Sequence, residues 1–236
     1  MFAIFKRELR SYFTSLVGYV VIGVMLAFIG LYYSANCLVY GTSDFSTVLY
    51  STTLVMLFLL PALTMRSFAD ERRNKTDQLL LTSPVSLWGV VGGKFLAACA
   101  VLLCSVALSL VFVLIVALYG QVYPQELAVG YLGFILQGCA FIALDMLISA
   151  QCCAPMTAAI VAFGGNLLLW LMDVLNAAID IKIVNSILTF ISPYQRCAPF
   201  KLGQLSFANA LYFVAAIFLC LFFSVRTLDA RRWREA

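Results

Sequence analysis

Charged residues are sparse along the chain and divide it into long uncharged stretches. Four stretches without Asp, Glu, Lys or Arg are bounded by Arg10 and Asp44, Asp44 and Arg66, Lys94 and Glu126, and Lys201 and Arg226. Each is long enough for the roughly 20 apolar residues that cross the hydrocarbon core of a bilayer as a helix. The pattern therefore predicts four membrane-spanning helices.

The region 126–180 has only two internal charges, Asp145 and Asp173, and a polar, proline-containing break in SAQCCAPMT, residues 149–157. The break divides the region into two further predicted spans, 127–150 and 156–178. The apolar run IVNSILTFIS, residues 183–192, has only ten residues and is too short to span. We therefore expect it to form a re-entrant or interfacial helix within an outer segment, 179–207.

The first fourteen residues show apolar positions at helical spacing before the first long apolar run begins. Phe2, Phe5 and Leu9 recur on one face, whereas Lys6 and Arg7 fall on the other. This pattern is typical of an amphipathic helix that lies in the membrane interface and turns its basic face toward anionic lipids. A simple basic flank that fixes topology is the alternative interpretation.

Composition agrees with this pattern, because 64% of the 236 residues are hydrophobic and 11% are charged. Soluble domains carry roughly 25% charged residues. Within lipid, backbone groups are satisfied inside helices. We therefore predict one all-α integral membrane domain over 1–236, with six spans, an interfacial helix at 1–14 and a polar connection at 66–88.

The distribution of Lys and Arg predicts the orientation, because short cytoplasmic loops carry the excess of basic residues. With the N-terminus in the cytoplasm and six spans, all but three of the 15 basic residues fall inside. The exceptions are Lys182, Arg196 and Lys201. A seventh span would place the basic C-terminal tail outside. We therefore expect a multi-pass protein of the cytoplasmic (inner) membrane with both termini in the cytoplasm.

The densest polar stretch, MRSFADERRNKTDQLLLTSP (residues 65–84), lies between the second and third spans. It combines both signs of charge with a short apolar triplet, which favours short helices that dock on another molecule. Charged networks at the rim of an interface favour specificity and rapid encounter. We therefore expect a soluble cytoplasmic protein as its partner.

Two blocks, KRELRSYFTS and LTMRSFADERRNKTDQLLLTSPVSLWGVVGGKFLAA, resemble the permease subunits of ABC-2 type transporters. The resemblance favours the branch that includes the gliding-motility and nitrous-oxide-reductase accessory permeases. The matching positions are Arg66, Phe68, Glu71, Arg72, Thr76, Leu79, Leu80, Leu81, Pro84, Val85, Val90, Val91, Gly93, Lys94 and Phe95. Lys75 and Gln78 depart from the family pattern, in which glycine and glutamate are usual.

This resemblance implies a dimer of two permease copies, identical or different, in which the 66–88 region acts as a coupling helix on an ATP-binding cassette subunit. The residues implied to contact that subunit are Asp70, Glu71, Arg72, Arg73, Thr76, Asp77, Leu79 and Leu80. The chain contains no GxxxxGK[ST] motif, so ATP and Mg are expected on the partner and no cofactor or catalysis on this chain. The resemblance also implies export, an accessory protein outside the membrane, lipid contacts and no nucleic-acid partner.

Polar residues inside the predicted spans are candidates for function, since ionisable groups facing lipid are costly. Asn166, Asp173, Asn176 and Asp180 share one stripe of the fifth span and would line a pathway or a dimer seam. A bond to a neighbouring helix near the hydrated surface is the alternative. The same two interpretations apply to Asp145 in the fourth span, which has Gln137 on a nearby face.

Two other function classes stay open on the sequence alone. An ion-coupled secondary transporter would use Asp145 and Asp173 to relay protons, and an assembly scaffold would need no ATPase at all. The chain has no histidine, and six of its eight cysteines lie in or beside predicted spans, where cysteine behaves as a small apolar residue. Cys37 and Cys197 both fall on the predicted outer side, where a disulfide between them is one option.

Gly89 and Gly93 predict a close approach of another helix to the start of the third span. Lys94 is predicted to snorkel to the inner surface.

Overall fold

The computed structural model describes the chain except for residues 40–44, 75–85, 120–122, 179–188, 190–191 and 236. The described part is helical and contains no strand. Its elements are α1 (Phe2–Thr14), α2 (Leu16–Tyr33), the π-helical turn η1 (Ser34–Val39), α3 (Phe45–Thr64), α4 (Arg66–Arg73), α6 (Leu87–Tyr119), α7 (Pro124–Gln151), α8 (Pro155–Ala178), α10 (Pro193–Lys201) and α11 (Phe207–Glu235).

Six of these helices are long and apolar enough to cross a membrane, which confirms the predicted all-α membrane architecture. The polar break between the fourth and fifth spans is shorter than the sequence suggested. Helix α7 continues to Gln151, and α8 begins at Pro155. Pro124 and Pro155 each occupy the first residues of a helix, where a missing backbone N–H costs nothing and the proline ring favours helical φ.

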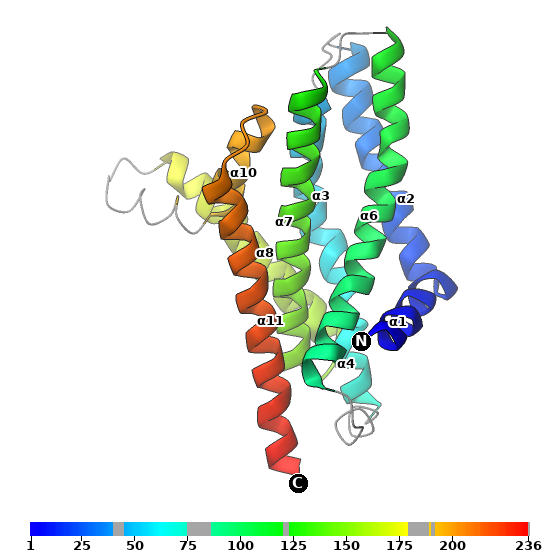
Figure 1. Cartoon of the computed structure of the whole chain (residues 1–236), viewed down its shortest axis with the longest axis vertical. Helices are drawn as coiled ribbons and strands as arrows, with labels where there is room; N and C mark the ends of the chain where they lie inside the picture. The colour runs from blue at the N-terminus through cyan, green and yellow to red at the C-terminus, as the bar shows by residue number, and fades with distance from the viewer. Residues whose placement is uncertain (40–44, 75–85, 120–122, 179–188, 190–191, 236) are drawn as a thin grey trace.

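The predicted N-terminal helix is present as α1, which lies across one end of the bundle (Figure 1). The same end holds α4 and the C-terminus of α11, whereas α10 lies toward the opposite end (Figure 1). An even number of crossings produces this arrangement, because each span reverses the direction of the chain.

Helix α7 is the centre of the molecule and packs against α3, α4, α6, α8, α10 and α11. Two glycines let its neighbours approach closely. An added Cβ at Gly133 would lie 2.6 Å from Phe200 Cβ in α10, and one at Gly138 would lie 2.6 Å from Leu102 Cδ2 in α6. These close contacts set the positions of an outer helix and of a long span against the same central helix.

The predicted re-entrant helix at 183–192 lies almost entirely outside the described residues. The next segment, within the predicted outer region 179–207, forms α10. The Ser192 side chain accepts a hydrogen bond from the Gln195 backbone N–H, and Pro193 is the first helical residue. Phe200 and Cys197 of α10 are buried with Phe213 of α11. A hydroxyl cap followed by proline was therefore a helix-start signal in this segment.

Candidate coupling site

Helix α4 continues directly from α3, with Met65 as the single residue between them. Its inner face contains Ser67, Phe68 and Ala69, which are buried, while Arg66 and Arg73 are exposed. Helix α4, which has only about two turns, is therefore amphipathic. One face belongs to the bundle, and the other is available at the surface.

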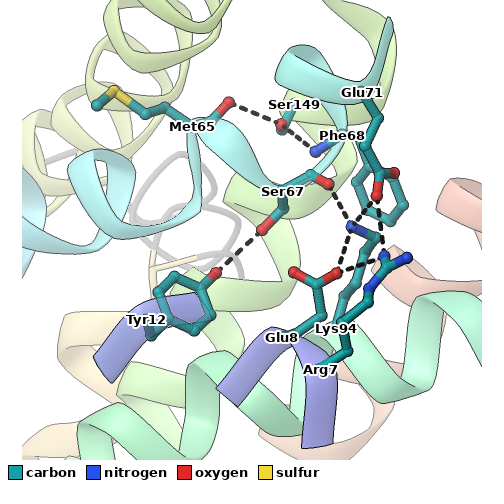
Figure 2. Close-up of polar contacts among 9 residues, drawn as sticks. All are labelled: Arg7, Glu8, Tyr12, Met65, Ser67, Phe68, Glu71, Lys94 and Ser149. Carbon is teal, nitrogen blue, oxygen red and sulfur yellow. Dashed lines mark hydrogen bonds and ion pairs between the residues drawn. The ribbon is translucent and has the colours of Figure 1, made fainter. Parts of the chain in front are cut away.

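Lys94, in the second turn of α6, is almost fully buried, with 2% of its side chain exposed. Its Nζ donates to Ser67 O at 2.7 Å, to Glu71 Oε1 at 2.8 Å and to Glu8 Oε1 at 3.3 Å (Figure 2). The Phe68 ring lies 5.3 Å from the same nitrogen. Two carboxylates and a carbonyl thus replace the water that an ammonium group needs.

This geometry corrects the expectation that Lys94 snorkels to the inner surface. The side chain is enclosed between α1, α4 and α6 instead of reaching solvent. The reason is local, because acceptors from two other helices, α1 and α4, surround the ammonium group.

Arg7 adds a second cation to the same two carboxylates. Its Nη2 donates to Glu8 Oε1 at 2.7 Å and to Glu71 Oε1 at 3.2 Å. The hydrogen bond to Glu8 raises the pKa of Arg7, and the negative charge of both glutamates acts in the same direction against partial burial. We call Arg7, Glu8, Glu71 and Lys94 the charge cluster. Its two acids and two bases balance, so three helices meet without a net buried charge.

A second contact joins α1 to α4 beside the charge cluster. The Tyr12 hydroxyl lies 3.3 Å from Ser67 Oγ (Figure 2). Burial raises the pKa of Tyr12 to about 12, with the hydrogen bond to Ser67 acting in the opposite direction. The hydroxyl therefore keeps its proton at neutral pH and can donate to Ser67.

Helix α4 is also bonded to the end of α7. Ser149 Oγ donates to Met65 O at 3.3 Å and accepts from the Phe68 backbone N–H at 3.4 Å. Arg72 Nη1 donates to Gln151 O at 3.0 Å, where the last carbonyls of α7 lack partners within the helix. The two bonds of Ser149 replace backbone hydrogen bonds at the α3–α4 junction.

Close approach of α1 to α6 depends on Gly93. A Cβ at this residue would lie 3.2 Å from Ile4 Cγ2 and 3.2 Å from Met1 O. The close contact predicted from Gly89 and Gly93 therefore includes the interfacial helix at Gly93. Because α1 sits this near the axis of α6, Glu8 reaches Lys94.

The residues predicted to contact a partner divide into three groups. Glu71 and Arg72 point into the protein through the bonds described above. Asp70 pairs at 3.9 Å with Arg66 one turn earlier on the surface of α4, and Arg73 is exposed at its end. Thr76, Asp77, Leu79 and Leu80 lie outside the described residues. The role of all eight in binding a partner stays a prediction.

Sequence reasoning did not identify Glu8, Tyr12 or Ser149 as parts of this site. One signal was present for Glu8, since it is the single acid among the basic residues of KRELR. A carboxylate within a basic face favours an ion pair with a particular basic side chain over contact with anionic lipid headgroups. Ser149 gave no such signal, because serine is common in helices and its partners are 81 and 84 residues away in sequence.

The polar stripe of the fifth span separates into different environments. Asn166 is fully buried and donates through Nδ2 to Asp145 Oδ1 at 2.9 Å. Asp173 is half-buried, and Asn176 Nδ2 donates to Thr189 Oγ1 at 3.1 Å. Asp180 lies outside the described residues. The predicted pathway or dimer seam at this stripe stays a prediction.

Two other sequence expectations can be compared with the coordinates. No disulfide joins Cys37 to Cys197, both of which the structure describes. Gln137 is buried in α7, eight residues or about 12 Å along the helix before Asp145.

Six long apolar helices, an N-terminal helix across one end and a polar junction at that end define a multi-pass α-helical membrane protein. The family model described as "ABC-2 family transporter protein" matches residues 5–172, which is more than half of the chain. The chain therefore belongs to the ABC-2 transporter family and is a permease component of that family. The match includes the whole charge cluster but does not distinguish the gliding-motility and nitrous-oxide-reductase accessory branch, which stays a prediction. A comparison with curated proteins found no match.

Proposed function

We propose that this chain is the membrane-spanning subunit of an ATP-driven exporter of the cytoplasmic membrane. A separate ATP-binding cassette subunit binds ATP and Mg, hydrolyses the nucleotide and docks on the end of the bundle that carries α4. Two permease copies assemble around the transport pathway. An accessory protein on the outer side is a further expected partner.

The observation that carries this proposal is the continuity of α3 with α4 and the bonding of α4 to three other helices. A displacement of α4 acts on α3 through a single connecting residue. It also acts on α6 through Lys94, on α1 through Arg7 and Tyr12, and on α7 through Ser149. The α4 junction therefore supports the role of an element that transmits a partner's movement to several spans.

The distribution of charge supports a cytoplasmic location for this end. Exposed basic side chains at the end that carries α4 include Lys6, Arg10, Arg66, Arg73 and Arg226. Positive residues concentrate on the cytoplasmic side of membrane proteins. An ATP-dependent partner would reach the exposed face of α4 from that side.

The direct test is co-purification of the chain with an ATP-binding cassette subunit encoded beside it, followed by ATPase and transport assays in proteoliposomes. We expect Arg73→Glu to reduce complex yield and transport at least tenfold, because this side chain is exposed at the free end of α4. Arg226→Glu is the matched control, since it reverses an exposed charge at the same end on α11. Equal loss in both variants, or in neither, would contradict docking at α4.

The same preparation separates the proposed function from its alternatives. Transport that needs a proton gradient and no ATPase subunit would support an ion-coupled secondary transporter. Stable assembly with other proteins and no transport under either condition would support a scaffold.

A further inference from the structure

Asp145 and Asn166 form a buried pair that joins α7 to α8 in the interior of the bundle. This pair is separate from the charge cluster and from α4. Both residues are fully buried, and Asn166 Nδ2 donates to Asp145 Oδ1 at 2.9 Å. Residue 145 lies six residues before the end of α7, within the apolar span. The pair is therefore a polar contact inside the membrane-spanning region.

Two side-chain oxygen atoms of this pair accept no hydrogen bond from the described residues. Asp145 Oδ2 and Asn166 Oδ1 are buried and have no hydrogen-bond partner among the described residues. Buried polar atoms in folded proteins almost always have a partner, so two orphan acceptors on two bonded side chains require an explanation.

No cation in the described part of the chain supplies that explanation. None of the ion pairs found there includes Asp145. On the neighbouring helix α11, the Cys220 thiol interacts electrostatically with Asp145 and carries no positive charge. An ionised carboxylate buried without a cation would be strongly destabilising.

We propose that Asp145 and Asn166 form a proton-binding site that holds α7 to α8. A proton on Asp145 Oδ2 turns that oxygen from an acceptor into a donor, and Asn166 Oδ1 is the unpartnered acceptor on the adjacent side chain. The carboxyl and the amide then exchange two hydrogen bonds, and the pair carries no net charge. The ligand of this site is a proton. Because Asp145 is in the fourth span and Asn166 is in the fifth, the bound proton contributes a hydrogen bond between the two spans.

One consequence concerns movement of α8. If α8 separates from α7, the carboxyl loses its amide partner and meets either lipid or water. In water it ionises and releases the proton, so separation of the two helices is accompanied by proton release. This linkage belongs to the permease itself and does not depend on the proposed ATPase partner.

Infrared difference spectroscopy of the purified protein at neutral pH tests the site directly. We expect a carbonyl band of a protonated carboxyl in the wild type, a shift of that band in D₂O, and its loss in Asp145→Asn. Asp173→Asn is the matched control and keeps the band, because Asp173 is half-buried and outside the pair. Asn166→Leu keeps the carboxyl and removes the amide, so the band moves to the frequency of a carboxyl with a weaker hydrogen bond.

Absence of the band in the wild type, or its survival in Asp145→Asn, would overturn the proposal. If Asp145→Asn does not accumulate, the wild type and Asn166→Leu still decide the question, since an identical band in both would exclude Asp145 as its source. None of these spectra requires ATP or a partner, so failure here leaves the proposed transport function untouched.

Discussion

At the scale of single residues, Lys94 is the side chain on which the α4 junction depends most. Its ammonium group is bonded to acceptors from α1 and α4 and is almost completely removed from solvent. A buried cation is tolerated only when its partners are in place, and removing one side of such a pair leaves the other side uncompensated. Lys94 and its acceptors therefore form a unit that loses stability when any member changes charge.

We expect Lys94→Met to destabilise the protein by about 3 kcal/mol, the lower range for breaking a buried pair, because the two glutamates remain partly exposed. Thermal unfolding of the purified protein in detergent is the measurement. Arg66→Met is the matched control, since its ion pair with Asp70 is at the surface and contributes less than about 1 kcal/mol. Equal midpoints for Lys94→Met and Arg66→Met would show that the charge cluster does not stabilise the junction.

Charge reversal at Glu71 acts on the charge cluster as well as on any partner of α4. A coupling role for residues 66–88 alone predicts that Glu71→Lys or Asp77→Lys uncouples ATP hydrolysis from transport, or lowers complex yield, without unfolding the membrane bundle. In the structure, a lysine at position 71 would face Lys94, whose Nζ is 2.8 Å from Glu71 Oε1. We now expect Glu71→Lys to reduce the yield of folded protein in the absence of any partner, while Glu71→Gln retains most of it. A normal yield of Glu71→Lys would contradict the burial of this site.

Burial of the Tyr12 hydroxyl makes a separate prediction about alkaline pH. Because the pKa of Tyr12 is raised above its usual value of 10, to about 12, the folded state holds this proton more tightly than the unfolded state. The associated stability is complete below about pH 10 and is lost as the pH rises toward 12. We expect Tyr12→Phe to flatten the fall in thermal stability over this range. An unchanged alkaline profile in Tyr12→Phe would place the hydroxyl in contact with solvent.

At the scale of helices, α1 is held against α6 by shape as well as by charge. Gly93 admits the backbone of Met1 and the side chain of Ile4 within 3.2 Å of where a Cβ would stand. We expect Gly93→Leu to displace α1 and increase the solvent accessibility of Lys94, measured by amine labelling. Gly164→Leu is the matched control, because nothing lies within 4 Å of a Cβ added there. Equal labelling in the two variants would contradict close docking of α1.

The spans were predictable from the sequence because lipid imposes a simple criterion of length and lack of charge. Residues 87–119 and 207–235 form helices longer than the apolar runs suggested, and the ends at Pro124 and Pro155 follow from proline chemistry. The charge cluster was less predictable. Glu8 and Lys94 are 86 residues apart in sequence. Hydrophobic periodicity predicts which face of α1 is apolar, but it does not predict which polar residue of α1 contacts another helix.

The interfacial helix shows this limit most clearly. Lys6, Arg7 and Arg10 were all assigned to a face that meets lipid, and all three are exposed. Arg7 nevertheless bonds to both glutamates of the charge cluster. A long side chain on a solvated face can reach an internal acceptor, and a one-dimensional pattern does not record that reach.

At the scale of the whole molecule, six spans place α1, α4 and the C-terminus at one end (Figure 1). We expect this end to face the cytoplasm, because the basic residues concentrate there. Alkaline phosphatase, which is active only outside the cytoplasm, should be inactive when fused after Asn74 and active when fused after Gln204. The reverse pattern would place α4 outside and remove the basis for an ATP-binding partner.

The central claim is that a nucleotide-hydrolysing subunit contacts α4. A photo-activated cross-linker at position 73, at the exposed end of α4, tests it most directly, with position 205 near α10 as the control at the opposite end. We expect a cross-link to an ATP-binding cassette subunit from position 73 and none from position 205. A complex that forms and transports but cross-links from position 205, or from neither position, would contradict it.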